Sequence, residues 1–455
     1  MSDRRDFVLE APLGRAIWSL AWPIALSNQL SVLTGGVMLF WLARLVGETG
    51  LVVDSLFRPF GFLVAWCFGS TSVGAGVLVS RSVGARDGRG LSIAAGTVTL
   101  CAWVCLGFIA VVVPISSWLA SLLSSGLPVE HSMLRFLIAW AVVAIPGLTI
   151  GEVLLDVANS TGATKYNLVR VLLDLAVMAA LTPILINVVG LGIAGGPVSE
   201  GVATLSLSVL LWFALNRGRN KLGLGELGAG AWKIRWGLWK EVLAIGVPVQ
   251  VGRVVMFGSQ MILVQRLARD GEAGVAGYGI ASAILLIGMM MTLAVAQSGS
   301  ILIGQSLGAG LRDRARRAIR AALLVGWSVM ALFIAATALD RPIVGLFTSD
   351  PAIMEAARHA LSILRWAGLG VATWQILLSC FSAHQATVRA SLLMIAGEMF
   401  GLAVAFSWPG SYLDAVCVAL VAANGLKGAL LLGLLATGKI TRAPAAAVVP
   451  PAAPH

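Results

Sequence analysis

Charged side chains inside long apolar stretches are the residues of this sequence that could do chemistry. The chain has 455 residues, of which 58% are hydrophobic and 12% are charged, and its mean hydropathy is +0.91. Soluble domains carry about 25% charged residues. A charge in hydrocarbon costs at least about 2.5–3.5 kcal/mol, so each one needs an ion-pair partner, a water-filled cavity or a function. Carboxylates in such places could bind a coupling proton or cation.

Glu200 stands in the sequence GGPVSEGVAT, roughly nine residues into an apolar segment and about 13 Å deep at helical rise. Arg58 lies at a similar depth in another segment, next to Pro59. One interpretation is a Glu200–Arg58 ion pair that stabilises the first half of the protein. The alternative is that Glu200 is a protonatable site that couples an ion gradient to transport. The sequence leaves both interpretations open.

Four other charges of the first half, Glu152, Asp156, Arg170 and Asp174, lie toward the inner ends of two segments. Arg170 and Asp174 are four residues apart, the spacing at which opposite charges pair on a helix. We therefore expect these two to pair, and we expect a structural role near the cytoplasmic surface for all four. Asp174 is kept as a coupling candidate, together with Glu200.

The second half has its own set of charges. Arg253, Arg365 and Glu398 fall near the middle of three apolar segments, and Lys427 is close enough to reach Glu398. One interpretation is a compensated network that bridges helices. The other is a cavity with a basic lining that favours anionic or zwitterionic substrates, with Glu398 as a third ion-coupling candidate.

Asparagine and glutamine side chains also occur within several of the apolar segments. Amides can hydrogen-bond varied substrates, while methionine and tryptophan supply adaptable apolar contacts. The substrate-cavity candidates are these amides and two arginines: Asn28, Gln29, Gln250, Arg253, Gln260, Gln297, Arg365 and Gln375.

Twelve apolar segments are long enough to cross about 30 Å of hydrocarbon. They span residues 16–42, 51–79, 91–114, 132–155, 166–189, 191–215, 241–267, 275–303, 318–339, 356–381, 390–408 and 412–437. Lys and Arg gather in alternate connections, for example at Arg81–Arg89, Arg217–Lys240 and Arg312–Arg320. Cytoplasmic connections are enriched in these residues. The sequence therefore predicts a multi-pass protein of the plasma (inner) membrane with both termini in the cytoplasm. Lys439 and Arg442, near the C-terminus, belong to the same cytoplasmic set of basic residues.

The two halves of the chain resemble each other. Pro23 and Pro248 open the first and seventh segments and are 225 positions apart, while Gly84 and Gly308 centre two basic turns and are 224 apart. Duplicated units with an even number of helices insert in the same orientation, and transporter substrates usually pass between such repeats. We expect an all-α polytopic membrane protein with twelve transmembrane helices in two pseudo-symmetric six-helix bundles around a central cavity.

This organisation divides the chain into five parts. They are a cytoplasmic N-terminus (1–15), an N-terminal six-helix bundle (16–215), a cytoplasmic connecting loop (216–240), a C-terminal six-helix bundle (241–438) and a disordered cytoplasmic tail (439–455). In the connecting loop, Trp232, Trp236 and Trp239 share one helical face, which predicts an interfacial helix on the inner leaflet.

Several functions are disfavoured by residue types. The five cysteines stand in apolar surroundings, the four histidines have no ligand spacing, and no nucleotide loop or nucleophile–base pair stands out. We expect no metal, no cofactor and no enzymatic activity. The net charge of +11 comes from basic residues in short gaps between apolar segments, so it does not predict nucleic-acid binding.

The run GQSLGAGLRDRARRA (Gly304–Ala318), with Gln297 upstream, resembles the multidrug and toxic compound extrusion (MATE) transporters. Looser matches are WPIALSNQL in the first segment, VGAGVLVSRSVGARDGR at the turn between the second and third segments, and GLGIAGGPVSE at the start of the sixth. The resemblance implies an efflux antiporter in which a proton or sodium gradient drives an amphipathic substrate outward.

Departures from the family pattern fall at its usual coupling acids. Many relatives carry an acid where this chain has Met38, and an Asn and an Asp where it has Met178 and Thr182. A glutamate of one subgroup would fall near Met256. Coupling would then run through Glu200 or through the Arg–Glu network.

The sequence thus predicts a secondary active efflux transporter that exports an amphipathic small molecule or drug by alternating access. We expect a monomer whose partners are that substrate, the proton or sodium ion, and the lipid bilayer. Two alternatives stay open: a lipid-linked glycan flippase of the same superfamily, and a non-transporting membrane partner that retains the fold.

Overall fold

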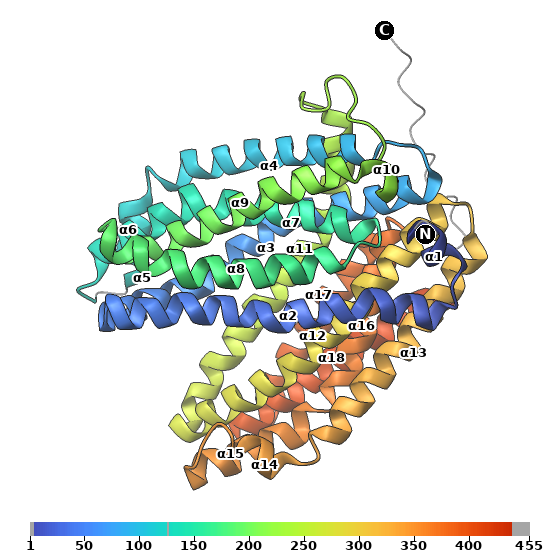
Figure 1. Ribbon diagram of the computed structural model, residues 1–455. Coiled ribbons are helices and arrows are strands. Elements are labelled where there is room, and N and C mark those ends of the chain that lie inside the picture. Colours follow the sequence, from blue (N-terminus) through green and yellow to red (C-terminus); the bar gives the residue numbers. More distant parts are fainter. Residues whose placement is uncertain (1–3, 125–126, 439–455) are drawn as a thin grey trace. The chain divides into compact units, whose positions relative to one another are not determined.

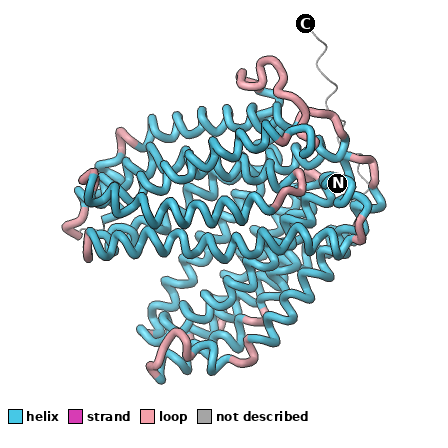
Figure 2. Tube along the Cα trace, in the orientation of Figure 1, coloured by secondary structure: helices cyan, strands magenta, loops and turns pink. Residues whose placement is uncertain are grey.

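The computed structural model describes residues 4–124 and 127–438, and all regular structure in that part of the chain is helical (Figures 1 and 2). The predicted tail, 439–455, with Lys439 and Arg442, lies outside the described residues. Five short helices connect or precede the long ones: α1 (Arg4–Glu10), α5 (Ser116–Ser124), α10 (Arg219–Leu222), η4 (Ala268–Asp270) and α14 (Asp340–Val344).

Within the described residues, eleven helices are long and apolar enough to cross a membrane, and a bent pair makes a twelfth span. The first six spans are α2 (Leu13–Leu45), α3 (Glu48–Ala85), α4 (Gly90–Val112), α6–η1–α7 (Glu130–Ala139, Trp140–Ala144, Ile145–Ser160), α8–η2 (Lys165–Pro183, Ile184–Val188) and η3–α9 (Gly192–Ala194, Gly195–Arg217). The last six are α11 (Trp236–Leu267), α12 (Glu272–Gly308), α13 (Arg312–Ala336), α15–α16 (Pro351–Leu364, Ala367–Ala383), α17 (Thr387–Ser407) and α18 (Tyr412–Ala436). All twelve coincide with predicted segments.

The tenth span is broken. Helices α15 and α16 meet at Arg365–Trp366 with a bend of 50°. Half-helices of this kind are a recurrent feature of transporters, because their ends leave backbone groups available within the membrane.

The chain forms two compact units. Of the described residues, the first contains those up to Ala11 and Ser19–Val254, and the second contains Pro12–Trp18 and those from Val255 on. Helix α11 therefore belongs to both units and passes from one to the other after Val254.

Close packing in the first unit depends on small residues where α3 meets α11. A methyl group added at Gly246 would lie 1.7 Å from the carbonyl oxygen of Ser70, and one added at Gly74 would lie 2.2 Å from that of Val242. Only glycine lets the two backbones approach so closely, which is how helices pack when lipid offers no hydrophobic driving force. The first half of α11 is thus fixed against α3.

The second unit packs α12 against α13, α15 and α16, and α17 against α18. Its core is apolar and continuous, from Leu263 on α11 through Leu285 on α12 to Leu361 on α15 and Val416 on α18. The bent tenth span is held on both sides of its break, because α15 and α16 both pack on α12.

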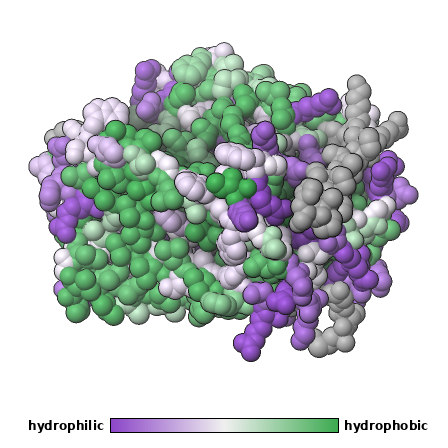
Figure 3. Space-filling model, turned by 90° about the horizontal axis from the view of Figure 1, so that it is seen from above, coloured by the Kyte–Doolittle hydropathy of each residue, from purple (hydrophilic) through white to green (hydrophobic). Residues whose placement is uncertain are grey.

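In Figure 3, hydrophobic residues cover much of the face shown, and hydrophilic residues gather toward its left and right sides. Large apolar side chains such as Trp103, Leu106 and Phe213 are more than half exposed. Such a surface suits a lipid environment.

The connecting loop differs from the predicted interfacial helix. Of residues 218–235, only α10 is helical, and α11 begins at Trp236, so the three tryptophans do not share one helix. Trp232 and Trp236 are exposed, whereas Trp239 is buried and donates a hydrogen bond from Nε1 to the Gly96 carbonyl at 3.0 Å. The helical interpretation was wrong because the glycines of LGAGAW stop the helix that the tryptophan spacing suggests.

Candidate transport and coupling residues

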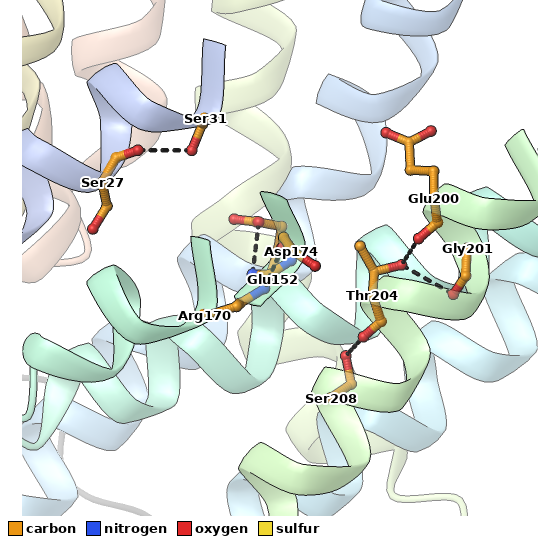
Figure 4. A network of polar contacts seen from close by, with 9 residues as sticks. All are labelled: Ser27, Ser31, Glu152, Arg170, Asp174, Glu200, Gly201, Thr204 and Ser208. Carbon is orange, nitrogen blue, oxygen red and sulfur yellow. Dashed lines mark hydrogen bonds and ion pairs between the residues drawn. The ribbon is translucent and has the colours of Figure 1, made fainter. Parts of the chain in front are cut away.

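Arg170, on α8, holds two carboxylates. Its Nε lies 3.5 Å from Asp174 Oδ2 one turn later, and its Nη1 lies 3.1 Å from Glu152 Oε1 on α7 (Figure 4). The predicted Arg170–Asp174 pair is present. Arg170 and Asp174 are buried, and the Glu152 side chain is half exposed. Two carboxylates share one guanidinium, so the group carries a net negative charge.

Glu200 extends from α9 away from that group, and its carboxylate is not joined to it in Figure 4. Its helix turn is held by Thr204, whose Oγ1 donates to the carbonyls of Glu200 at 2.8 Å and Gly201 at 3.2 Å. The Glu200 carboxylate makes no hydrogen bond or ion pair to another described residue. Three charged side chains are nevertheless near enough to act on it electrostatically. They are Asp174 on α8 and Asp54 and Arg58 on α3.

The Glu200–Arg58 ion pair, one of the two interpretations that the sequence leaves open, is not formed, although Arg58 is near enough to act on Glu200 electrostatically. Arg58 pairs instead with Asp54, one turn earlier on α3. Asp54 is buried, and our sequence reasoning missed it. Its spacing of four residues from Arg58 was the signal that could have found it, since opposite charges four residues apart are neighbours on a helix.

Neutral groups occupy the positions where the family resemblance implies coupling acids. Ser199 Oγ lies 2.8 Å from Thr182 Oγ1 and 3.6 Å from Met178 Sδ. Gly196, one turn before Ser199, faces Met38 across a gap that a methyl group would close to 3.4 Å. Helices α2, α8 and α9 therefore meet here around hydroxyl and thioether groups. No carboxylate takes part in these contacts between the described residues.

Glu398, on α17, is the most enclosed of the predicted coupling residues. Its Oε1 lies 2.5 Å from Lys427 Nζ on α18, and its Oε2 accepts a hydrogen bond from Ser259 Oγ at 2.9 Å. The Lys427 ammonium also lies 4.8 Å from the centre of the Trp374 ring, whose Nε1 donates to Asn424 at 2.8 Å. The predicted Glu398–Lys427 contact is confirmed, and both charges are almost fully buried.

The two arginines predicted to join that network do not pair with Glu398. Arg253 belongs to the first unit, where it interacts with Asp156 of α7. Arg365 lies at the break between α15 and α16, and its Nε donates to the Ser362 carbonyl at 3.1 Å. Counting residues into a segment predicts depth but not the direction of a side chain, and it takes no account of a helix break.

The predicted amides are divided between satisfied and unsatisfied groups. Gln375 is buried and accepts a hydrogen bond from Thr292 Oγ1 at 2.8 Å. Gln250 Oε1 and Gln297 Oε1 are buried with no hydrogen-bond partner among the described residues. The remaining three amides, all partly buried, are Asn28, Gln29 and Gln260.

An all-helical fold with eleven to twelve hydrophobic spans among the described residues, and with buried charges in both units, defines a polytopic membrane protein. The MatE family matches residues 23–184 and 248–408, and the chain belongs to this family of transporters, which are not enzymes. The two matched segments begin at Pro23 and Pro248, the prolines that the sequence pairs as repeats.

Individual relatives are distant. The multidrug export protein MepA of Staphylococcus aureus (strain N315) is 24% identical over 423 residues, which cover 88% of this chain and 91% of that protein. The probable multidrug resistance protein YoeA of Bacillus subtilis (strain 168) is 24% identical over 380 residues, or 81% of this chain and 79% of that protein. A crystal structure of MATE in the straight conformation matches with a TM-score of 0.84 at 18% identity, over 97% of this chain and 100% of that one. This last likeness shows the fold.

Proposed function

We propose that this protein is a secondary active efflux transporter that exports an amphipathic small molecule or drug by alternating access, driven by a proton or sodium gradient. The observation that supports this most is the MatE match to both halves of a chain that keeps ionisable residues within both units. The names of the distant relatives MepA and YoeA, a multidrug exporter and a probable multidrug resistance protein, point to the same substrate class.

Coupling requires a carboxylate that binds and releases an ion during the cycle. Glu200 fits this role because no described residue neutralises it through an ion pair. Asp174 and Glu398 are held by Arg170 and Lys427, so they would have to leave those partners first. Separating a buried carboxylate from its cation costs several kcal/mol. Asp174 and Glu398 would therefore leave their partners only if substrate binding assists the separation.

Substrate binding would use the amides together with apolar surface. Gln250 and Gln297 each offer an unsatisfied carbonyl oxygen, which a substrate N–H or O–H group could satisfy. Gln375 would have to exchange its hydrogen bond with Thr292, so it is a weaker candidate. The positive charge of Arg365, at the helix break, supports the proposal that the protein binds substrates with anionic or zwitterionic groups.

The protein is proposed to lie in the plasma membrane as a monomer with both termini in the cytoplasm. The support is the Lys and Arg content of alternate connections. Arg81–Arg89 and Arg312–Arg320 would then face the cytoplasm at equivalent points of the two halves.

The test is transport by the purified protein in liposomes. Ethidium efflux is measured with a proton gradient, with a sodium gradient and with neither. Gradient-dependent ethidium movement is the expected result. An anionic dye is tested in the same way, because Arg365 favours anionic groups. A protein that moves a fluorescent lipid-linked glycan but neither dye would be a flippase, and one that moves none of the three would be a non-transporting membrane partner.

A further inference from the structure

The connecting loop between α10 and α11 lies along α4 within the first unit (Figure 1). Leu91 N, near the start of α4, donates a hydrogen bond to the Leu224 carbonyl at 2.9 Å, and Thr99 Oγ1 donates to the Trp232 carbonyl at 3.4 Å. Leu91 and Thr99 are eight residues apart, which is about 12 Å along a helix. The loop therefore covers the first turns of α4.

The end of this loop and the start of α11 carry three exposed cations, Lys233, Arg235 and Lys240. None of the three forms an ion pair with another residue in the part of the chain that the structure describes. Arg235 Nη1 donates only a long hydrogen bond, 3.5 Å, to the Ser92 carbonyl. One exposed carboxylate, Glu241, follows them. The surface therefore keeps a net positive charge that is open to a ligand.

Large apolar side chains alternate with these cations. Trp232, Ile234 and Trp236 are between 47% and 67% exposed. The Trp232 ring packs against the ring of Trp212 on α9, with centroids 5.0 Å apart, and the Trp236 ring packs against that of the buried Trp239 at 5.2 Å. Each ring is thus held along one edge and open along the other. We call residues 232–240 the Trp232–Lys240 segment.

The depth of the segment is limited by its backbone. Residues 223–235 form neither helix nor strand, and such backbone cannot face hydrocarbon because its polar groups need water or headgroups. One turn beyond Thr99, Trp103 of α4 is 53% exposed and continues the apolar surface of that helix. The segment therefore lies at the level of the lipid headgroups, where tryptophan is enriched in membrane proteins.

The chemistry of the segment selects an anionic phospholipid. Lys and Arg side chains near a membrane surface attract lipids with a net negative charge and gain little from headgroups whose charges cancel. The tryptophan and isoleucine side chains match the glycerol and upper acyl region of the same molecule. A free phosphate ion offers only the first of these two contacts.

A second basic surface of the chain lacks the apolar part. Arg312, Arg317 and Arg320 are exposed at the start of α13, and no aromatic residue stands between 304 and 326. These arginines supply the same number of positive charges without tryptophan beside them. They are therefore a matched control for the effect of charge alone.

We propose that the Trp232–Lys240 segment binds an anionic phospholipid of the inner leaflet. Lys233, Arg235 and Lys240 contact the phosphate, and the exposed tryptophans contact the glycerol and acyl region. The bound lipid holds the connecting loop against α4. The choice of leaflet rests on the proposed orientation of the protein, whereas the binding itself requires neither that orientation nor efflux activity.

The experiment measures lipid binding to the purified, full-length protein in a neutral detergent by native mass spectrometry. The protein is titrated with phosphatidylglycerol or with phosphatidylcholine, and we expect the first phosphatidylglycerol to bind more tightly. The triple variant Lys233→Gln/Arg235→Gln/Lys240→Gln should lose this preference, by about fivefold in affinity for each cation removed. All three side chains are exposed, so the variant should remain monodisperse.

The control variant Arg312→Gln/Arg317→Gln/Arg320→Gln should keep the preference. An equal loss in the two triple variants would show that charge alone attracts the lipid, and it would overturn the assignment. Equal affinity of the wild-type protein for the two lipids would overturn it as well. Glycerol phosphate should not displace the lipid at equal concentration, and displacement would mean that the site takes free phosphate.

Tryptophan fluorescence locates the lipid. Brominated phosphatidylglycerol should quench the wild-type protein more than the variant Trp232→Phe/Trp236→Phe, because these two rings lie at the proposed site. Identical quenching would place the lipid elsewhere and overturn the assignment. Ethidium transport is measured separately, so a protein that moves no ethidium but passes these tests would contradict the efflux function and leave the lipid site standing.

Discussion

Ion pairs at the residue scale form between neighbours. Asp54 and Arg58 pair within one turn of α3, and so do Arg170 and Asp174 on α8. Glu398 and Lys427 bridge the adjacent helices α17 and α18. A buried charge that loses its partner is far more costly than a surface one, so these pairs should differ greatly in their response to substitution.

Lys427→Met tests the most enclosed of these pairs. It leaves Glu398 charged and buried, and we expect the protein to lose about 3–5 kcal/mol of stability. The double variant Lys427→Met/Glu398→Gln should recover most of the loss. Thermal unfolding in detergent measures both, with the exposed Lys240→Met as the control. A Lys427→Met protein as stable as the wild type would contradict a closed ion pair.

Asp87, in the turn between α3 and α4, gives a pH-dependent prediction. Burial raises the pKa of this carboxyl, but hydrogen bonds from Ser82 and Arg89 outweigh burial, and the pKa is lowered overall. A lowered pKa stabilises the fold above the ordinary aspartate value and loses that contribution as pH falls through the folded-state value. Asp87→Asn should therefore cost about 1 kcal/mol at neutral pH and little at about pH 3.

The check on Asp87 is the melting temperature across this pH range. Asp313→Asn is the matched control, because Asp313 stands in the first turn of α13, just after the corresponding basic turn of the second half, and its side chain is 89% exposed. Equal losses in the two variants, or a loss at Asp87 that does not change with pH, would show that the turn is not held by this carboxylate.

At the scale of elements, helix contacts in the first unit depend on the absence of side chains. The α3–α11 contact brings Gly246 against the Ser70 backbone, which fixes the part of α11 that carries Gln250 and Arg253. Helix α11 also has glycines in open surroundings, such as Gly258. The same substitution can therefore have opposite consequences on one helix.

Gly246→Ala should destabilise the protein by about 1–3 kcal/mol or more, because the added methyl group forces the two backbones apart. Gly258→Ala, on the same helix, should be neutral or slightly stabilising, since alanine has the better helix propensity. Thermal unfolding of the two variants decides between them. Similar melting temperatures would mean that α3 and α11 do not pack closely.

At the scale of the whole molecule, the alternation of hydrophobic segments and basic connections is the feature of the sequence that predicts the membrane spans and their orientation. The twelve spans, the paired prolines and the local Arg170–Asp174 pair could all be predicted, because each depends on spacing along the chain. The Asp54–Arg58 pair was missed although its spacing along α3 indicates it. The partner of Arg253 could not be predicted, because it depends on the rotation of packed helices. The break at Arg365 could not be predicted either, because Gly368 and Gly370, which follow it, are residues that unbroken membrane helices also contain.

Membrane orientation is tested with single cysteines. With both termini in the cytoplasm, Ala229→Cys should react with an impermeant maleimide only from inside, and Ser349→Cys only from outside. Both positions are exposed, between spans six and seven and between spans nine and ten. The native cysteines are replaced first, including the exposed Cys67. Labelling of both positions from the same side would contradict an odd number of spans between them.

The passage of α11 through both units has a consequence for dissecting the protein. The loop before Trp236 separates the two halves of the sequence and is the obvious place to divide the chain. A fragment that begins there, however, contains the first half of α11, which packs in the first unit. Two separately expressed fragments, 1–228 and 229–455, should therefore complement each other and co-purify. Neither should be stable alone, because Gly246 and Val242 would be separated from the α3 backbone that they contact. A functional split protein of this kind would carry its own assembly signal within a transmembrane helix.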